Sequence, residues 1–117
     1  NIDIVRQVSQ QLKDIDDNLI KSFVNTFAKS CMNNSEYTEF SNEVLFSLAD
    51  KQPKSLIRIL DQNKKQIDLN LILNAFSNPI NDGVNVKHIR QQIESVNTKS
   101  SIRNKIIDAL NIAIGNH

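Results

Sequence analysis

Apolar residues along this chain recur at helical spacing. Over most of its length they fall at positions i, i+3 and i+4, which places them on one face of an α-helix. The pattern predicts helices over about residues 2–12, 17–31, 36–50, 53–65, 69–76 and 86–96, and a last one that begins at Thr98 or Ser100 and stops at Gly115. The broad apolar face that ends at Cys31 makes the second of these the strongest helix in the pattern.

Capping residues stand where several of these helices should begin. Asp16 and Asp17 stand at the start of the second predicted helix, Asp68 precedes the fifth and Asn85 the sixth, and both residue types accept hydrogen bonds from the free amides of a first turn. Pro53 suits the first position of the fourth helix, where a missing N–H costs nothing. Local sequence therefore predicts where these helices begin.

The turn residues that a β-sheet protein needs are scarce. With only two glycines and two prolines in 117 residues, the chain is predicted to be all-α, a single compact domain over residues 1–117. We expect about six or seven short antiparallel helices, arranged either as an orthogonal bundle or as stacked helix pairs. The segment "VLFSLADKQPKSLIRIL", Val44–Leu60, resembles the helix–turn–helix unit of HEAT-type repeats, with a proline opening its second helix.

Three large apolar residues fall off the main stripes. Phe46, Leu71 and Ile112 each point roughly opposite to the other apolar residues of their helix. A helix that is apolar on two sides usually lies between neighbours, so we expect these side chains to be buried. The alternative is an exposed patch for a partner.

The stretch "FSNPINDGVNVKHI", residues 76–89, is predicted to be a corner between two helices. Pro79 ends the first helix, Asp82 and Gly83 make a turn in which Gly83 takes a positive φ, and Asn85 caps the second helix. Four apolar side chains are expected to point inward and fix the corner to the core: Phe76, Ile80, Val86 and Ile89.

Residues that could carry chemistry are few. The single Cys31 lies on an apolar helix face, where burial disfavours a reactive thiolate. His117 is the last residue, which leaves His88 as the one well-placed imidazole, and a lone histidine beside an apolar stripe is typically a surface or packing residue. Metal-ligand spacings and glycine-rich phosphate loops are missing from the sequence. We therefore predict no enzyme activity, no metal and no cofactor.

Charge is distributed unevenly along the chain. Residues 1–50 carry four Lys or Arg against eight Asp or Glu, whereas residues 51–117 carry ten against five. An acidic row lies on the third predicted helix and a basic row follows it in sequence. Together with His88 these rows are the candidate partner-binding residues: Glu36, Glu39, Glu43, Lys51, Lys54, Arg58 and His88.

These features favour a non-catalytic helical protein–protein interaction domain, of an adaptor or an inhibitor (immunity) type, whose protein partner is unidentified. One alternative is nucleic-acid binding through the basic C-terminal half; it is disfavoured by the net charge of +1 and by a single aromatic residue in that half. A second alternative is an enzyme of unfamiliar type, for which a deep polar pocket around His88 with a carboxylate nearby would be the sign.

No apolar run is long enough to cross a bilayer, so we expect a soluble protein, either cytoplasmic or extracytoplasmic after removal of a signal. Asn and Ile occur 16 times each and Lys ten times, which suggests a low-GC bacterial genome.

Overall fold

The computed structural model describes residues 2–28, 35–81 and 83–115, and within these ranges every regular element is an α-helix. The helices are α1 (Ile2–Gln10), α2 (Asp17–Val24), α3 (Ser35–Lys51), α4 (Pro53–Gln62), α5 (Leu69–Ser77), α6 (Val86–Glu94) and α7 (Ser101–Gly115). The predicted all-α fold in one compact unit is confirmed. None of the helices in these ranges has the length and apolar character that crossing a membrane requires.

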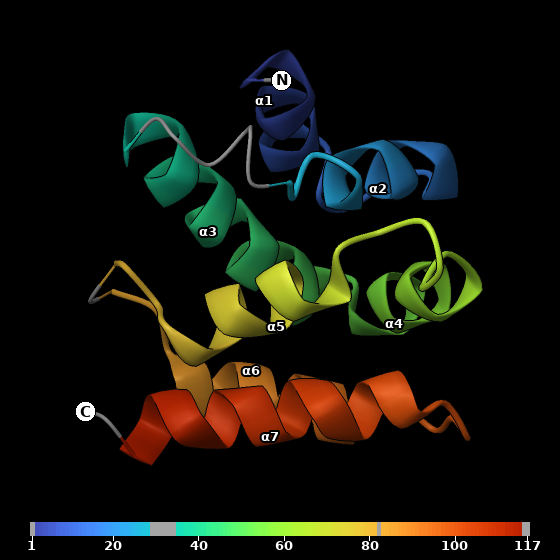
Figure 1. The fold of residues 1–117 in the computed structure, drawn as a ribbon, viewed down its shortest axis with the longest axis vertical. Coiled ribbons are helices and arrows are strands. Elements are labelled where there is room, and N and C mark those ends of the chain that lie inside the picture. Colours follow the sequence, from blue (N-terminus) through green and yellow to red (C-terminus); the bar gives the residue numbers. More distant parts are fainter. Residues whose placement is uncertain (1, 29–34, 82, 116–117) are drawn as a thin grey trace.

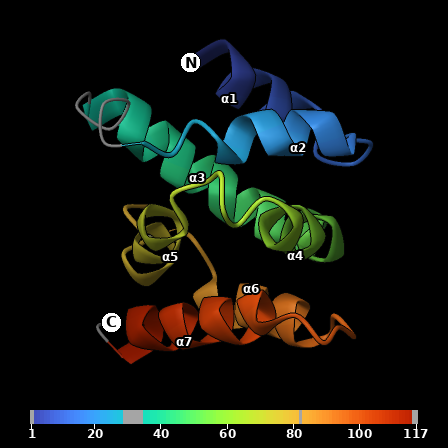
Figure 2. The ribbon, with the colours of Figure 1, turned by 45° about the vertical axis from the view of Figure 1, so that its right-hand side comes forward.

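Helix pairs are arranged in three tiers, and the remaining helix, α5, lies between α3 of the second tier and α7 of the third (Figure 1). The first tier is α1 with α2, the second α3 with α4, and the third α6 with α7. Successive tiers are joined by packing of α1 on α3, α2 on α4, α3 on α6 and α4 on α7. Helix α5 packs against α7 and α3, and Figure 2 shows the same order of tiers from a second direction.

The predicted starts of α2, α5 and α6 are confirmed, with Asp16 and not Asp17 as the cap of α2. The side chains of Asp16, Asp68 and Asn85 each accept a hydrogen bond from the backbone N–H three residues further on, at 2.8, 3.1 and 3.1 Å. Pro53 opens α4 as predicted. These caps satisfy amides that have no partner inside their own helix, which is why local sequence was sufficient to locate them.

Helix α2 ends earlier than predicted, at Val24 instead of near Cys31. Two polar side chains end it. Asn25 Nδ2 donates to the Lys21 carbonyl at 2.8 Å, and Thr26 Oγ1 donates to the Phe23 carbonyl at 2.6 Å. Such local bonds compete with continuation of the helix. The core continues past the break, because Phe27 is buried edge-to-face against Phe23 with ring centroids 5.4 Å apart.

The three residues off the main stripes have different environments. Phe46 is buried as predicted and packs edge-to-face on Phe76, with ring centroids 5.4 Å apart. Leu71 is half-buried. The burial predicted for Ile112 is wrong, because it is 55% exposed, and the inward direction predicted for Ile80 is wrong too, because it is 47% exposed. No neighbouring helix covers these two isoleucines, and they are the only exposed large apolar residues in the described ranges.

Asn42, a buried residue of α3, fixes the corner after α5. Its Nδ2 donates to the carbonyls of Ala75 (3.1 Å) and Asn78 (3.3 Å), and its Oδ1 accepts from the Ile80 backbone N–H (3.1 Å). Asn42 is only 4% exposed, and both ends of its side-chain amide are hydrogen-bonded. Their partners are backbone groups on either side of Pro79, where the helical hydrogen-bond pattern stops. The corner is thus held by a buried polar contact as well as by apolar packing.

The turn within the corner has a different geometry from the one predicted. The positive φ expected for Gly83 is wrong, since no described residue, glycines included, has one. The Asn81 side chain makes the turn instead, because its Oδ1 accepts from the Gly83 N–H at 2.8 Å while its carbonyl accepts from the Val84 N–H at 3.2 Å. An Asx turn of this kind does not require a left-handed backbone.

Side-chain hydrogen bonds also join the tiers. Gln52 Nε2, between α3 and α4, donates to two backbone carbonyls of the loop after α1, at 2.9 and 3.1 Å. Gln92 Nε2 on α6 donates to the Asp50 carbonyl of α3 at 3.0 Å, and Ser100 Oγ donates to Asp61 Oδ1 of α4 at 3.0 Å. Each bond links segments about 40 residues apart and so resists sliding of one tier over the next.

Candidate functional site

The acidic row predicted on the third helix forms an exposed edge of α3. We call Glu36, Glu39 and Glu43 the acidic edge; all three are exposed. No basic side chain in the described ranges lies within ion-pair distance of any of them. Glu36 stands in the first turn, where the helix dipole favours a negative charge. Glu39 and Glu43 are one turn apart, and like charges at that spacing destabilise a helix slightly.

The basic row is divided by the fold and partly used inside the molecule. Lys51 ends α3 and contacts its neighbour Asp50 at 3.6 Å. Arg58 on α4 contacts both carboxylate oxygens of Asp17 on α2, at 2.8 and 2.9 Å. Lys54 is exposed and has no ion pair within the described ranges. The structure therefore does not bring the row together as one free basic surface.

His88 pairs with a carboxylate at the start of α6. Its Nε2 lies 3.1 Å from Asp50 Oδ1 of α3, and the two side chains are 52% and 22% exposed. The pair stands at the side of an open hollow of about 330 Å³ between α3 and the corner. Glu43 also lines this hollow, so the acidic edge continues into it, and Ser47 and Asn81 contribute further polar groups.

This hollow has part of what a catalytic site needs. The carboxylate of Asp50 can orient the His88 imidazole, as the acid of a nucleophile–base–acid set does. A nucleophile would have to be engaged by the imidazole, yet no hydrogen bond joins His88 to Ser47 in the described part of the chain. The hollow is open, and half of the His88 side chain is in solvent. The imidazole and the carboxylate are therefore accessible to a group from solvent.

Arginines of the basic C-terminal half are held by internal contacts. Arg90 on α6 donates to Asn111 Oδ1 of α7 at 2.8 Å and pairs with Glu94 at 3.3 Å. Arg103 on α7 donates to the Glu94 carbonyl at 2.8 Å. These groups join α6 to α7, and a guanidinium already engaged in this way is less available to a phosphate. The contacts therefore engage these two arginines within the fold.

Two other candidates fall outside what the structure describes: Cys31 and His117. Within the described ranges no three His, Cys, Asp or Glu side chains gather as metal ligands would.

Sequence reasoning missed Asn42 and the surface around α5. A hydropathy pattern cannot identify a buried asparagine, because it assigns any polar residue of a helix to the solvent-facing side. The exposure of Ile80 and Ile112 depends on which helices pack beside them, which local sequence does not contain. The only available signal was the position of Ile112 off its stripe, for which an exposed patch was the alternative interpretation.

Comparisons of this chain with protein-family models, with curated proteins and with solved structures found no match.

Proposed function

We propose that this chain is a non-catalytic helical interaction domain, of an adaptor or inhibitor (immunity) type, that binds a basic segment of a protein partner along the acidic edge of α3. One observation supports the proposal: three exposed carboxylates lie on one side of a single helix, and no cation of the described chain is paired with them. Glu43 extends the negative charge into the hollow beside His88.

The energetic argument concerns the charges themselves. Glu39 and Glu43 repel each other along α3, and pairs at this spacing cost a helix on the order of 0.2–0.5 kcal/mol. A cationic partner would convert this repulsion into attraction and would be guided to the edge by the same field. Arg58, by contrast, already has an internal carboxylate partner, so the acidic edge is the better candidate surface.

We further propose that the three tiers are HEAT-like helix pairs. Contacts between successive tiers, α1 on α3 and α3 on α6 along one side and α2 on α4 and α4 on α7 along the other, support this arrangement. In repeats of that kind each pair packs on its neighbours, and the exposed helix faces serve as extended binding surfaces. Helix α5 departs from the pattern as an additional helix between α3 and α7.

A charge-matched pair of variants tests the proposed function. The probe is a fluorescently labelled, capped peptide rich in Arg and Lys, and its binding is followed by fluorescence anisotropy. We expect E39Q/E43Q to weaken binding by roughly tenfold, because two charge-assisted contacts are lost. The control D14N/D108N changes net charge equally at exposed sites on other elements, the loop after α1 and α7, and should leave binding unchanged.

Affinity capture from a cell lysate with the same variants extends the test to natural partners. A specific partner is retained by the wild-type chain and by D14N/D108N and is lost with E39Q/E43Q. If both double variants behave alike, binding follows net charge alone and the acidic edge is only a solvated helix face.

A further inference from the structure

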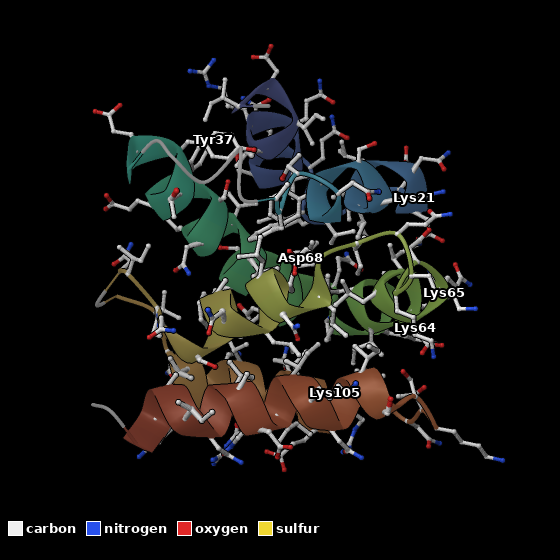
Figure 3. The ribbon with its side chains drawn as sticks, in the orientation of Figure 1. Lys21, Tyr37, Lys64, Lys65, Asp68 and Lys105 are labelled. Carbon is white, nitrogen blue, oxygen red and sulfur yellow. The ribbon has the colours of Figure 1, made fainter. Side chains whose placement is uncertain are left out.

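The two exposed large apolar residues of the described chain lie on opposite sides of α5. Ile80 borders a groove of about 250 Å³ between α3 and α5, together with Phe27, Leu71 and Ala75. Ile112 borders a groove of about 480 Å³ between α5 and α7, together with Leu73 and Ala109. In Figure 3, Asp68 at the start of α5 and Lys105 on α7 mark the face where these helices run side by side. Both exposed large apolar residues of the described chain thus lie beside one helix, α5.

A ridge of three asparagines separates the two grooves. Asn70, Asn74 and Asn78 follow each other at intervals of four residues, and all three are exposed. Asn70 borders the groove beside α7, Asn78 the groove beside α3, and Asn74 both. Within the described ranges the side chains of Asn70 and Asn74 make no hydrogen bond, while Asn78 Nδ2 donates to the Asn74 carbonyl at 2.9 Å. Asparagine is a weak helix former, so nothing inside the helix favours it at positions 70 and 74, whereas Asn78 is the residue that caps the end of α5.

We propose that this face of α5 binds an uncharged segment of a partner protein in extended conformation, with the asparagines recognising its main chain. Four residues of helix rise about 6 Å, and two residues of an extended chain span roughly 6.6 Å. Every second residue of such a segment directs both its N–H and its C=O to the same edge. A carboxamide carries one acceptor and two donors, so Asn70 and Asn74 can each pair with both groups of one residue, and Asn78 keeps one donor and its acceptor.

The same geometry directs the side chains of the segment into the grooves. In an extended chain, side chains alternate between two opposite faces, and a chain lying edge-on along α5 would turn one set toward α3 and the other toward α7. Hydrogen bonds to the main chain of the segment would then supply affinity, and the fit of its side chains into the grooves would supply selectivity, as in other cases of strand recognition. The asparagine ridge and the two exposed isoleucines are thereby explained by one occupant.

Charge defines the chemistry of that occupant. The groove beside α3 has no charged side chain in its lining. The groove beside α7 has one of each sign, Lys105 and Asp108. The groove beside α3 gives no compensation for burying a charge, and the two opposite charges beside α7 favour neither sign, so the segment carries no net charge and has apolar residues at every second position toward α3. This distinguishes it from the basic partner of the acidic edge.

The test selects displayed random peptides on the wild-type domain and measures the recovered peptides, made synthetically, against variants. We expect uncharged sequences with apolar residues at alternate positions, bound roughly tenfold or more weakly by N70A/N74A. That variant should fold at least as well as the wild type, because alanine is the better helix former, so lost binding would not reflect unfolding. N18A, which removes an exposed asparagine on α2, is the matched control and should bind normally.

Backbone methylation of the selected peptide gives the sharpest result. Methylating the N–H groups of every second residue should abolish binding for one alternate set and spare it for the other, since only one edge faces α5. Any of five results would overturn the proposal. The two methylated sets could bind equally, the selected peptides could show helical i, i+3, i+4 spacing, or N70A/N74A could bind as well as the wild type. The domain could instead dimerise through this face as its concentration rises, or the selection could recover no peptide. E39Q/E43Q should leave these peptides bound, so this result does not depend on the acidic edge.

Discussion

The hydrogen bonds of Asn42 give the most direct stability prediction. Replacing Asn42 with alanine removes three hydrogen bonds from a side chain that is 4% exposed. The Ala75 carbonyl keeps a partner, because it also accepts from the Asn78 N–H at 3.2 Å. The Asn78 carbonyl and the Ile80 N–H would have no other hydrogen-bond partner in the described part of the chain. The corner after α5 would therefore lose its hydrogen bonds to α3 and keep only its apolar packing.

The size of the effect follows from these contacts. A net contribution of about 1 kcal/mol per hydrogen bond, with two backbone groups left unpaired in a partly buried site, gives a loss of about 2–3 kcal/mol. For a chain of this length that corresponds to a fall in Tm of roughly 8–15 °C. Urea unfolding followed by far-ultraviolet circular dichroism would measure it, with the slope of the transition unchanged.

Asn74→Ala is the matched control for Asn42→Ala. Asn74 is an exposed asparagine on α5 with no side-chain hydrogen bond in the described ranges, so its replacement should be neutral or slightly stabilising. If Asn42→Ala costs less than about 0.5 kcal/mol, the effect of an ordinary surface substitution, then water replaces the lost contacts. The account of Asn42 as the connection between α3 and the corner would then be wrong.

Three further results are expected. Gln52→Ala should lower the free energy of unfolding by about 1–2 kcal/mol, because it removes two hydrogen bonds between the first and second tiers; an unchanged urea midpoint would contradict this. A double-mutant cycle on Arg58 and Asp17 should give a coupling of about 0.2–1 kcal/mol that falls at high salt, since the pair is half-exposed. The chain should elute from heparin near or below about 0.15 M salt, whereas retention well above it that is lost in K99Q/K105Q would support nucleic-acid binding.

How much of the fold the sequence predicts depends on how local each feature is. Asp68 and Asn85 cap helices whose amides lie three residues away, and the structure has both contacts as expected. The end of α2 was missed although its cause is also local, because apolar periodicity outweighed the hydrogen bonds of Asn25 and Thr26. Periodicity reports which face is apolar, and a buried turn can continue that face without a helix.

The candidate site is predicted less completely than the fold. Exposure of the acidic edge follows from its helical spacing, so Glu36 and Glu39 lie where expected. The internal pairing of Arg58 with Asp17 and the contact of His88 with Asp50 each join two different helices. Contacts of that kind depend on the distance between helices, which no spacing within a helix encodes.

The sequence by itself determined the helical character of this protein, most helix starts and the residues of its main apolar faces, because propensity, capping and periodicity act within a few residues of each position. Only the tertiary structure decided the tiered packing, the role of Asn42 and the exposure of Ile80 and Ile112 beside α5. Burial is a property of what packs against a residue, and the groups that surround Asn42 and flank α5 come from segments more than 30 residues apart.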